Sequence, residues 1–247
     1  MNRFFVDPKC IQGNKVILNN PIAHQVKSVL RLNPGQEIQI ADNLGNEYQV
    51  RLESFYPTHI EGTITNKTHR QTEPTIAISL YQGIMKGDRF ETTLQKGTEI
   101  GISKFVPVAC ERSQPKVSMI WFQNRSRRWG KILQEASEQS GRTYIPRLDK
   151  PDSLLNSFGS ASGLRLIAWE KEQDIGLKTV IQENENIIVE KGISVFVGPE
   201  GGFSPEEIES ATKLEVRRVS LGPRILRAET AGIVIASAVM YHFGELQ

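Results

Sequence analysis

The hydrophobic pattern changes once along the chain. From Arg3 to about Ile64, apolar and polar residues alternate in short runs, as is typical of β-strands that bury one face. The one helical stretch in this part lies at about Pro21–Leu30, and turn-forming residues at 33–35 and 42–46 separate the runs. The pattern predicts a small β-barrel, with strands at 15–18, 36–40, 48–52 and 59–64.

A polar segment at 66–74 ends in Pro74 and predicts a domain boundary, with a first domain at 1–70 and a second at 74–247. Beyond it, apolar runs alternate with helical periodicity, which predicts an α/β domain with a mostly parallel sheet. The last helix is apolar on nearly all sides, so we expect it to be buried or to form a subunit interface. The expected strands are 75–81, 104–109, 164–169, 193–197 and 217–221, and the expected helices are 88–100, 125–140 and 228–243.

Composition and charge limit the class of protein. The 247 residues include 30 Lys and Arg against 28 Asp and Glu, a formal net charge of +2, so any basic surface must be local. A hydrophobic content of 38% and a charged content of 23% exclude a wholly disordered, fibrous or membrane-spanning chain. Asp7 and Pro8 stand where a signal peptide would have its apolar region, so we expect a cytoplasmic protein with no membrane partner. Cys10 and Cys110 lack metal-binding spacing, and we expect reduced, buried thiols and no metal site.

Two glycine-containing loops follow expected strands. The first has the sequence GPEGG at 198–202, and Ser204, Pro205 and Glu207 then supply the N-cap, first turn and capping box of a helix. The second runs from Leu221 to Ala231 and opens the apolar last helix. Ligands lie at the carboxyl ends of strands in open α/β sheets, and glycine lets backbone groups approach a ligand closely. A tight structural turn is the alternative, and neither loop matches a dinucleotide fingerprint or a P-loop.

Basic residues are concentrated locally. Arg125, Arg127, Arg128 and Lys131 lie close to Trp129 within a short expected helix, and Arg112 precedes a loop. Such a cluster favours either nucleic-acid binding or a solvated helix face.

The motifs and their order resemble the RsmE ribosomal RNA methyltransferases of the SPOUT superfamily, over almost the whole chain. The segments that carry the resemblance are RFF at 3–5, residues 24–32, KGDRFE at 86–91, LQKGTEIG at 94–101, ERS at 111–113, EASEQSGR at 135–142, GPEGGFS at 198–204 and LGPRILRAETA at 221–231. The resemblance implies an N-terminal PUA-like β-barrel followed by a SPOUT α/β domain with a C-terminal trefoil knot, and a homodimer. It also implies methylation of N3 of a uridine in 16S rRNA of the small ribosomal subunit.

The same resemblance implies S-adenosylmethionine as the methyl donor, without a metal, because the donor's methyl group is already carried on a sulfonium. The expected donor-binding residues are Trp169, Glu170, Gly198, Pro199, Glu200, Gly201, Gly202, Leu221, Gly222, Ile225, Leu226 and Ala231. The segment Trp169–Glu172 departs from the family's pattern.

Uridine N3 is a poor nucleophile until it loses its proton, so the site needs a base or a cation that stabilises the uridine anion. Arg227 and Arg89 are the expected cations, and Glu229 is a candidate base, although a carboxylate at a helix N-terminus is also stabilised by the helix dipole. The expected contacts to RNA, within the assembled subunit, come from Arg3, Arg31, Arg112, Arg125, Arg127 and Arg128.

Two alternatives stay open. One is a non-catalytic RNA-binding or ribosome-assembly factor that kept the barrel and lost methyl transfer, against which the intact loops argue. The other is a SPOUT methyltransferase that acts on transfer RNA.

Overall fold

The computed structural model describes residues 2–114, 116 and 118–246, which form two compact units. The first unit consists of the residues up to Glu73 together with Ser137–Ile145. The second consists of Pro74–Ala136 and the residues from Pro146 onward. Nothing in the hydrophobic pattern indicated that the segment 137–145 belongs with the first unit.

The first unit is built on a six-stranded, curled sheet with the order β1-β4-β5-β6-β3-β2. Strands β1 and β4 are parallel and all other neighbours are antiparallel. The register between β5 and β6 shifts at two places, and such bulges bend a sheet. The strands are β1 (Arg3–Phe5), β2 (Ile11–Gln12), β3 (Lys15–Asn19), β4 (Glu37–Ala41), β5 (Asn46–Phe55) and β6 (His59–His69); the helical turns are η1 (Pro8–Cys10), α1 (Ile22–His24) and the π-helical η2 (Gln25–Val29).

The turn between β4 and β5 is fixed by a buried carboxylate. Asp42 accepts hydrogen bonds from the Asn46 side chain at 2.7 Å, from the amides of Leu44 and Asn46 at 2.8 and 3.1 Å, and from the Tyr48 hydroxyl at 3.1 Å. Burial acts to raise the pKa of Asp42, but these hydrogen bonds outweigh it and hold the pKa below its ordinary value of 3.8. Asp42 therefore stabilises this turn in its charged form.

The segment 137–145 is bound to the first unit by hydrogen bonds. The backbone carbonyl of Arg142 accepts from Arg3 at 2.7 Å, and the side chain of Arg142 pairs with Glu73. The amide of Thr143 donates to the Thr72 hydroxyl at 2.9 Å. These groups are buried or half-buried, so the segment completes the unit's polar interior.

The second unit contains a parallel sheet with the order β10-β8-β7-β12-β11-β13, and β9 pairs with β8. Strand β12 is buried at every position, which fits its place between β7 and β11. The predicted strands 104–109 and 193–197 are confirmed residue for residue. The strands are β7 (Ile78–Gly83), β8 (Lys104–Ala109), β9 (Arg147–Leu148), β10 (Asp152–Ser153), β11 (Leu164–Ala168), β12 (Ile193–Val197) and β13 (Arg217–Val219).

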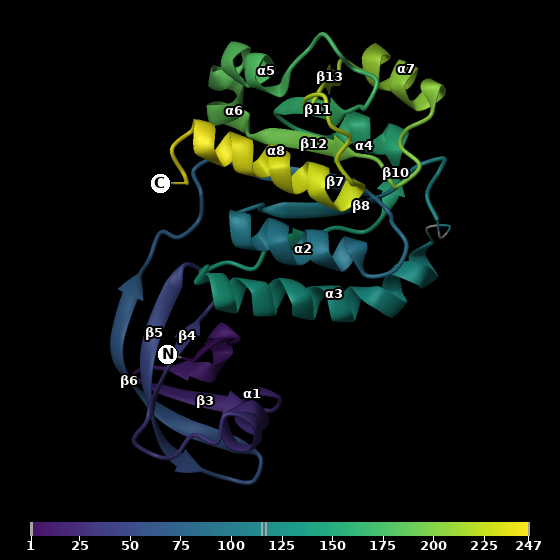
Figure 1. Ribbon diagram of the computed structural model, residues 1–247. Coiled ribbons are helices and arrows are strands. Elements are labelled where there is room, and N and C mark those ends of the chain that lie inside the picture. Colours follow the sequence, from purple (N-terminus) through teal and green to yellow (C-terminus); the bar gives the residue numbers. More distant parts are fainter. Residues whose placement is uncertain (1, 115, 117, 247) are drawn as a thin grey trace. The chain divides into compact units, whose positions relative to one another are not determined.

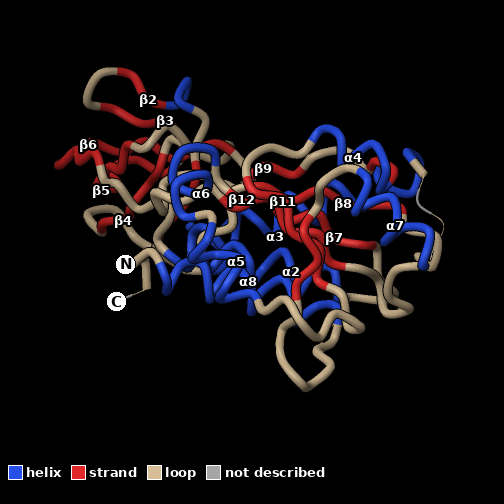
Figure 2. Tube along the Cα trace, turned by 90° about the horizontal axis from the view of Figure 1, so that it is seen from above, coloured by secondary structure: helices blue, strands red, loops and turns tan. Residues whose placement is uncertain are grey.

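Helices cover both faces of this sheet (Figure 1, Figure 2). On one face α2 (Arg89–Ile100) and α8 (Ala228–His242) pack together, with α3 (Met119–Ser140) alongside α2. On the other face α4 (Leu154–Ser160) and α7 (Pro205–Lys213) enclose an apolar core with β7, β8 and β12. Short helices α5 (Leu177–Glu183) and α6 (Glu185–Lys191) lie in the crossover from β11 to β12. Among the residues that the structure describes, none of the helices has both the length and the apolar character to span a bilayer.

The cysteines are both free thiols. Cys110 is buried as expected, and burial, together with the nearby Glu207 carboxylate, raises the pKa of its thiol. Cys10 is only half-buried, which differs from the prediction. Across the described part of the chain, no cluster of His, Cys, Asp and Glu side chains is arranged to hold a metal ion.

Candidate functional site

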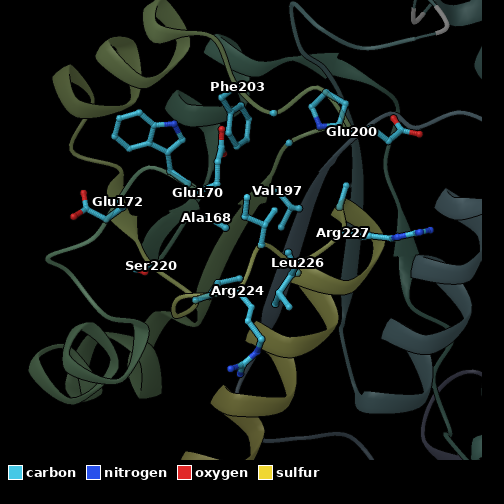
Figure 3. A pocket seen from close by; sticks show the side chains of 18 of the residues that line it. Ala168, Glu170, Glu172, Val197, Glu200, Phe203, Ser220, Arg224, Leu226 and Arg227 are labelled. Carbon is cyan, nitrogen blue, oxygen red and sulfur yellow. The ribbon is translucent and has the colours of Figure 1, made fainter.

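A pocket of about 870 Å³ lies at the carboxyl ends of β11, β12 and β13 (Figure 3). Because these strands are parallel neighbours, the loops that follow them meet at one edge of the sheet. The loops supply residues 169–170, 172–173, 198–203 and 220–227 of the lining, and Arg89 and the first turn of α8 contribute as well. This volume lies within the range of pockets that hold small molecules and cofactors.

The loop after β12 packs against the end of β7. The side-chain amide of Gln82, which is fully buried, donates to the carbonyl of Gly198 at 3.3 Å. A Cβ on Gly83 would lie 2.5 Å from the nitrogen of Pro199, so only glycine allows this approach. At the far end of the loop the predicted capping box is confirmed. The amide of Ser204 donates to the Glu207 carboxylate at 2.8 Å, and the amide of Glu207 donates to the Ser204 hydroxyl at 3.3 Å.

Two glycines in this loop keep neighbouring side chains close to the backbone. Gly202 has a φ of +66°, and a Cβ there would come within 3.2 Å of the Glu170 carboxylate. A Cβ on Gly201 would meet the side chain of Arg112 at 3.1 Å. Arg112 in turn donates to the carbonyl of Gly201 at 2.9 Å. The glycines therefore fit the loop against Glu170 and Arg112.

The loop after β11 is ordered by a buried carboxylate that the sequence reasoning missed. Glu172 accepts hydrogen bonds from the amides of Asp174 and Ile175 at 3.0 and 3.2 Å and lies 3.4 Å from the Nε of Arg218. The Arg218 guanidinium lies 5.6 Å from the centre of the Trp169 ring. This chain of contacts fixes Trp169 beside the pocket. The only available signal was the position of Trp169–Glu172 at a strand end.

The loop after β13 presents apolar and basic side chains. Ile225 is 83% exposed and Leu226 is half-buried at the pocket wall. Arg224 and Arg227 extend in different directions from this loop (Figure 3). An exposed apolar side chain beside a pocket is suited to an aromatic ring of a ligand.

The charged groups of the pocket form a network around Glu229. Arg89 donates to Glu200 at 2.8 Å, and Glu200 also accepts from the amide of Lys86 at 3.0 Å. Glu229 lies 3.9 Å from both Arg89 and Arg227. The side chain of Arg227 is 78% exposed, whereas that of Glu229 is 16% exposed. One oxygen of Glu229, Oε2, is buried and has no hydrogen-bond partner within the described part of the protein.

The structure brings together every residue predicted to bind the donor, since all of them line this one pocket. Arg89, Arg227 and Glu229 line it as well. The lining residues that the sequence reasoning missed are Ala168, Glu172, Gln173, Val197, Phe203, Ser220, Pro223, Arg224 and Ala228. Their roles, like those of the predicted residues, stay predictions.

The arginines predicted to bind RNA have different surroundings. The side chain of Arg3 is only 6% exposed and is held by Glu47 and the carbonyl of Arg142. Its guanidinium is inaccessible to a phosphate, so we correct its expected role to a structural one. Arg31 is exposed in the first unit, and Arg112 is exposed beside the loop after β12. The other three, Arg125, Arg127 and Arg128, are exposed on α3, where Arg128 pairs with Glu91 at 2.6 Å.

Comparisons with known proteins agree with this architecture. Residues 71–240 match the RNA methyltransferase domain family. The chain is 32% identical to the ribosomal RNA small subunit methyltransferase E of Bacillus subtilis, over 98% of this chain and 96% of that protein. It is also 32% identical to the protein of the same name from Mesomycoplasma hyopneumoniae, over 95% of this chain and 97% of that protein.

A solved structure is similar along the whole chain. The ribosomal RNA small subunit methyltransferase E of Neisseria gonorrhoeae, bound to S-adenosylmethionine, superposes with a TM-score of 0.86 at 28% identity and covers 98% of both chains. The chain therefore belongs to the RNA methyltransferase family, in the group of the ribosomal RNA small subunit methyltransferase E proteins.

Proposed function

We propose that this protein transfers a methyl group from S-adenosylmethionine to N3 of a uridine in the 16S rRNA of the small ribosomal subunit. The names of its relatives and the S-adenosylmethionine bound to the Neisseria structure support the reaction class. The observation that carries the proposal is the single pocket in which three strand-end loops meet Arg227 and Glu229.

The residues present fit this donor. Gly198, Gly201 and Gly202 leave backbone groups accessible beside the pocket, and Ile225 and Leu226 supply apolar surface. Gly202 and Glu170 pack so closely that a side chain at 202 would reach the carboxylate. The donor-binding residues are those predicted above. When bound, S-adenosylmethionine supplies an electrophilic methyl group on a positively charged sulfur.

The chain's own task is to make uridine N3 nucleophilic. Glu229 is the base that accepts the N3 proton, because it lines the pocket and its side chain is 16% exposed there. Once the proton has moved to the carboxylate, the negative charge of the uracil ring is stabilised by Arg227, whose exposed guanidinium is free to meet the base. N3 would then take the methyl group while the bond between the methyl carbon and the donor's sulfur breaks and its electron pair stays on that sulfur.

Arg89 has a different role in this proposal from the one first expected. Its guanidinium is bound at 2.8 Å by Glu200, which belongs to the loop after β12. Arg89 also lies 3.9 Å from Glu229. Arg89 therefore holds the donor loop and Glu229 in position, and Arg227 is the cation that contacts the base.

The wider assembly is part of the proposal. The curled sheet is a PUA-like barrel that binds RNA. The proposed boundary between the domains 1–70 and 74–247 stands at the segment between them, with Ser137–Ile145 as the part of the later sequence that returns to the first unit. The C-terminal region is a trefoil knot, which is supported by the return of α8 from the sheet edge at β13 to α2 and β7. The protein works in the cytoplasm as a homodimer, supported by Val234 and Tyr241, apolar residues on one side of α8 that are 37% and 75% exposed.

Small ribosomal subunits from a strain that lacks this protein provide the test. The purified protein, given these subunits and S-adenosylmethionine with a tritiated methyl group, is expected to label 16S rRNA at one uridine. Digestion and mass mapping then identify the base and the methylated nitrogen. Label in transfer RNA instead, or donor binding by calorimetry without any label in RNA, would overturn the proposed substrate or the proposed catalysis.

A further inference from the structure

The first turns of α3 carry a series of aromatic rings that extends from the core to the surface. Phe90 of α2 packs against Trp129 with ring centres 4.5 Å apart, and both rings are almost fully buried. Trp121 meets Trp129 edge to face at 5.2 Å and is itself half-buried. The Trp121 ring is therefore anchored on the core side and reaches the surface on the other.

Arg125 extends this series to the surface. Its guanidinium carbon lies 4.8 Å from the centre of the Trp121 ring, and the residue is exposed. A guanidinium that stacks on a fixed ring is held as a flat, charged surface and loses little further freedom when a ligand binds. Ile120, next to Trp121, is 71% exposed and adds apolar surface. We call Ile120, Trp121 and Arg125 the stacking surface.

The stacking surface is connected to the methyl-transfer pocket through α2. Arg128, one turn along α3, donates to Glu91 at 2.6 Å and lies 3.7 Å from Asp88. Asp88 directly precedes Arg89, which lines the pocket. The first turn of α2 thus contacts α3 through Asp88 and Glu91 and carries Arg89 of the pocket lining.

The three exposed arginines of this helix differ in their contacts. Arg128 is committed to two carboxylates of α2. Arg127 has no ion pair or hydrogen bond within the described residues, so it is a free positive charge. Arg125 alone has an aromatic partner.

We propose that the stacking surface binds an unpaired base of the substrate RNA that flanks the target nucleotide, with the base lying on the Arg125 guanidinium. This inference rests on the proposed function. Unpaired bases are recognised in RNA by stacking on aromatic rings and on arginine planes, and a positively charged plane also attracts the phosphates on either side. Arg127 contributes charge only.

A charge-conserving substitution separates stacking from simple attraction. R125K keeps the positive charge but removes the flat guanidinium, and R127K is its matched control on the same helix. Binding to unmethylated small ribosomal subunits is measured by filter binding across a salt series. R125K is expected to bind about tenfold more weakly at every salt concentration with an unchanged salt dependence, whereas R127K stays within twofold of the wild type.

Other outcomes decide against the inference. Wild-type affinity in R125K would show that Arg125 acts as a point charge, and equal losses in R125K and R127K would show that the Trp121 ring gives Arg125 no special role. Calorimetry with S-adenosylmethionine on both variants verifies an intact donor site. If the wild-type protein does not bind the subunits, the proposed function fails. If the wild type binds and R125K binds with the same affinity, only the proposed role of the stacking surface is overturned.

Discussion

Replacing Arg227 by alanine tests the central step of the proposed reaction. In the resting protein this guanidinium is 78% exposed and lies 3.9 Å from Glu229. An exposed ion pair of this kind contributes about 0–1 kcal/mol, so R227A should fold normally and keep its affinity for RNA and donor. The loss should appear only when the uracil ring becomes negatively charged.

The size of that loss follows from the geometry. Two unit charges about 4 Å apart interact by about 4 kcal/mol at an effective dielectric constant of 20, which sets an upper limit near a factor of about 10³ in rate. Removal of one donor to a developing anion in enzymes lowers rates by about 10²–10³. We therefore expect the single-turnover rate of R227A to fall by about 10²–10³.

The assay follows transfer of a tritiated methyl group to unmethylated small ribosomal subunits, with protein in excess. R224A is the matched control, because Arg224 is exposed on the same loop and lines the same pocket without an ion pair in the described structure. Its rate should stay within about threefold of the wild type. A full single-turnover rate in R227A, or an equal loss in R224A, would refute the assignment of Arg227 as the cation that stabilises the base.

The other predictions concern the base, the donor loop, the assembly and the first unit. E229Q should lower the single-turnover rate by about 10², and the deficit should shrink as the pH rises, because hydroxide then removes the N3 proton without the carboxylate. G202A should weaken S-adenosylmethionine binding at least tenfold in calorimetry. G87A is the control, because Gly87 has a φ of +64° close to the +66° of Gly202 but has open space where the Cβ would lie, and this variant should bind the donor normally. Light scattering should find a dimer in the wild type and monomers in Y241E, because the substitution places a charge on the exposed apolar side of α8. D42N should unfold at lower urea concentration at pH 7, by about 1–3 kcal/mol. Since the pKa of Asp42 is lowered in the folded protein, this difference should shrink as the pH falls below the unfolded value near 4.

Elements with strong periodicity or strong end signals were predictable from the sequence. The strand Ile193–Val197 is apolar at every position except Ser194, because its neighbours β7 and β11 and the helices on both faces bury every side chain. The start of α7 was predictable because a capping box is a local interaction within four residues. Helices α5 and α6 were missed, since each is seven residues long and together they bury only Val180, Ile181 and Ile188.

The candidate site was predictable as far as it depends on strand ends. Loops that follow strands of one parallel sheet lie at the same edge, so the two glycine loops were expected to lie near each other. In the structure β11 separates β12 from β13, and the loop after β11 takes part in the same pocket. The roles of single charges could not be predicted, because they depend on partners that are distant in the sequence. Arg3 looked like a surface residue until Glu47 and Arg142 were found around it. Glu172 gave no sign of its contact with Arg218, which lies in β13.

The first unit is interrupted in the sequence, and this affects how the chain matures on the ribosome. Glu73 and Thr72 leave the exit tunnel long before Arg142 and Thr143, with β7, α2, β8 and α3 made in between. Until Arg142 has emerged, the guanidinium of Arg3 lacks the carbonyl that accepts one of its hydrogen bonds. The polar interior of the first unit is therefore completed only after Pro74–Ala136 of the second unit has been made. A fragment truncated at Glu73 would leave these polar groups unpaired and is expected to be a poor autonomous module for expression or transplantation.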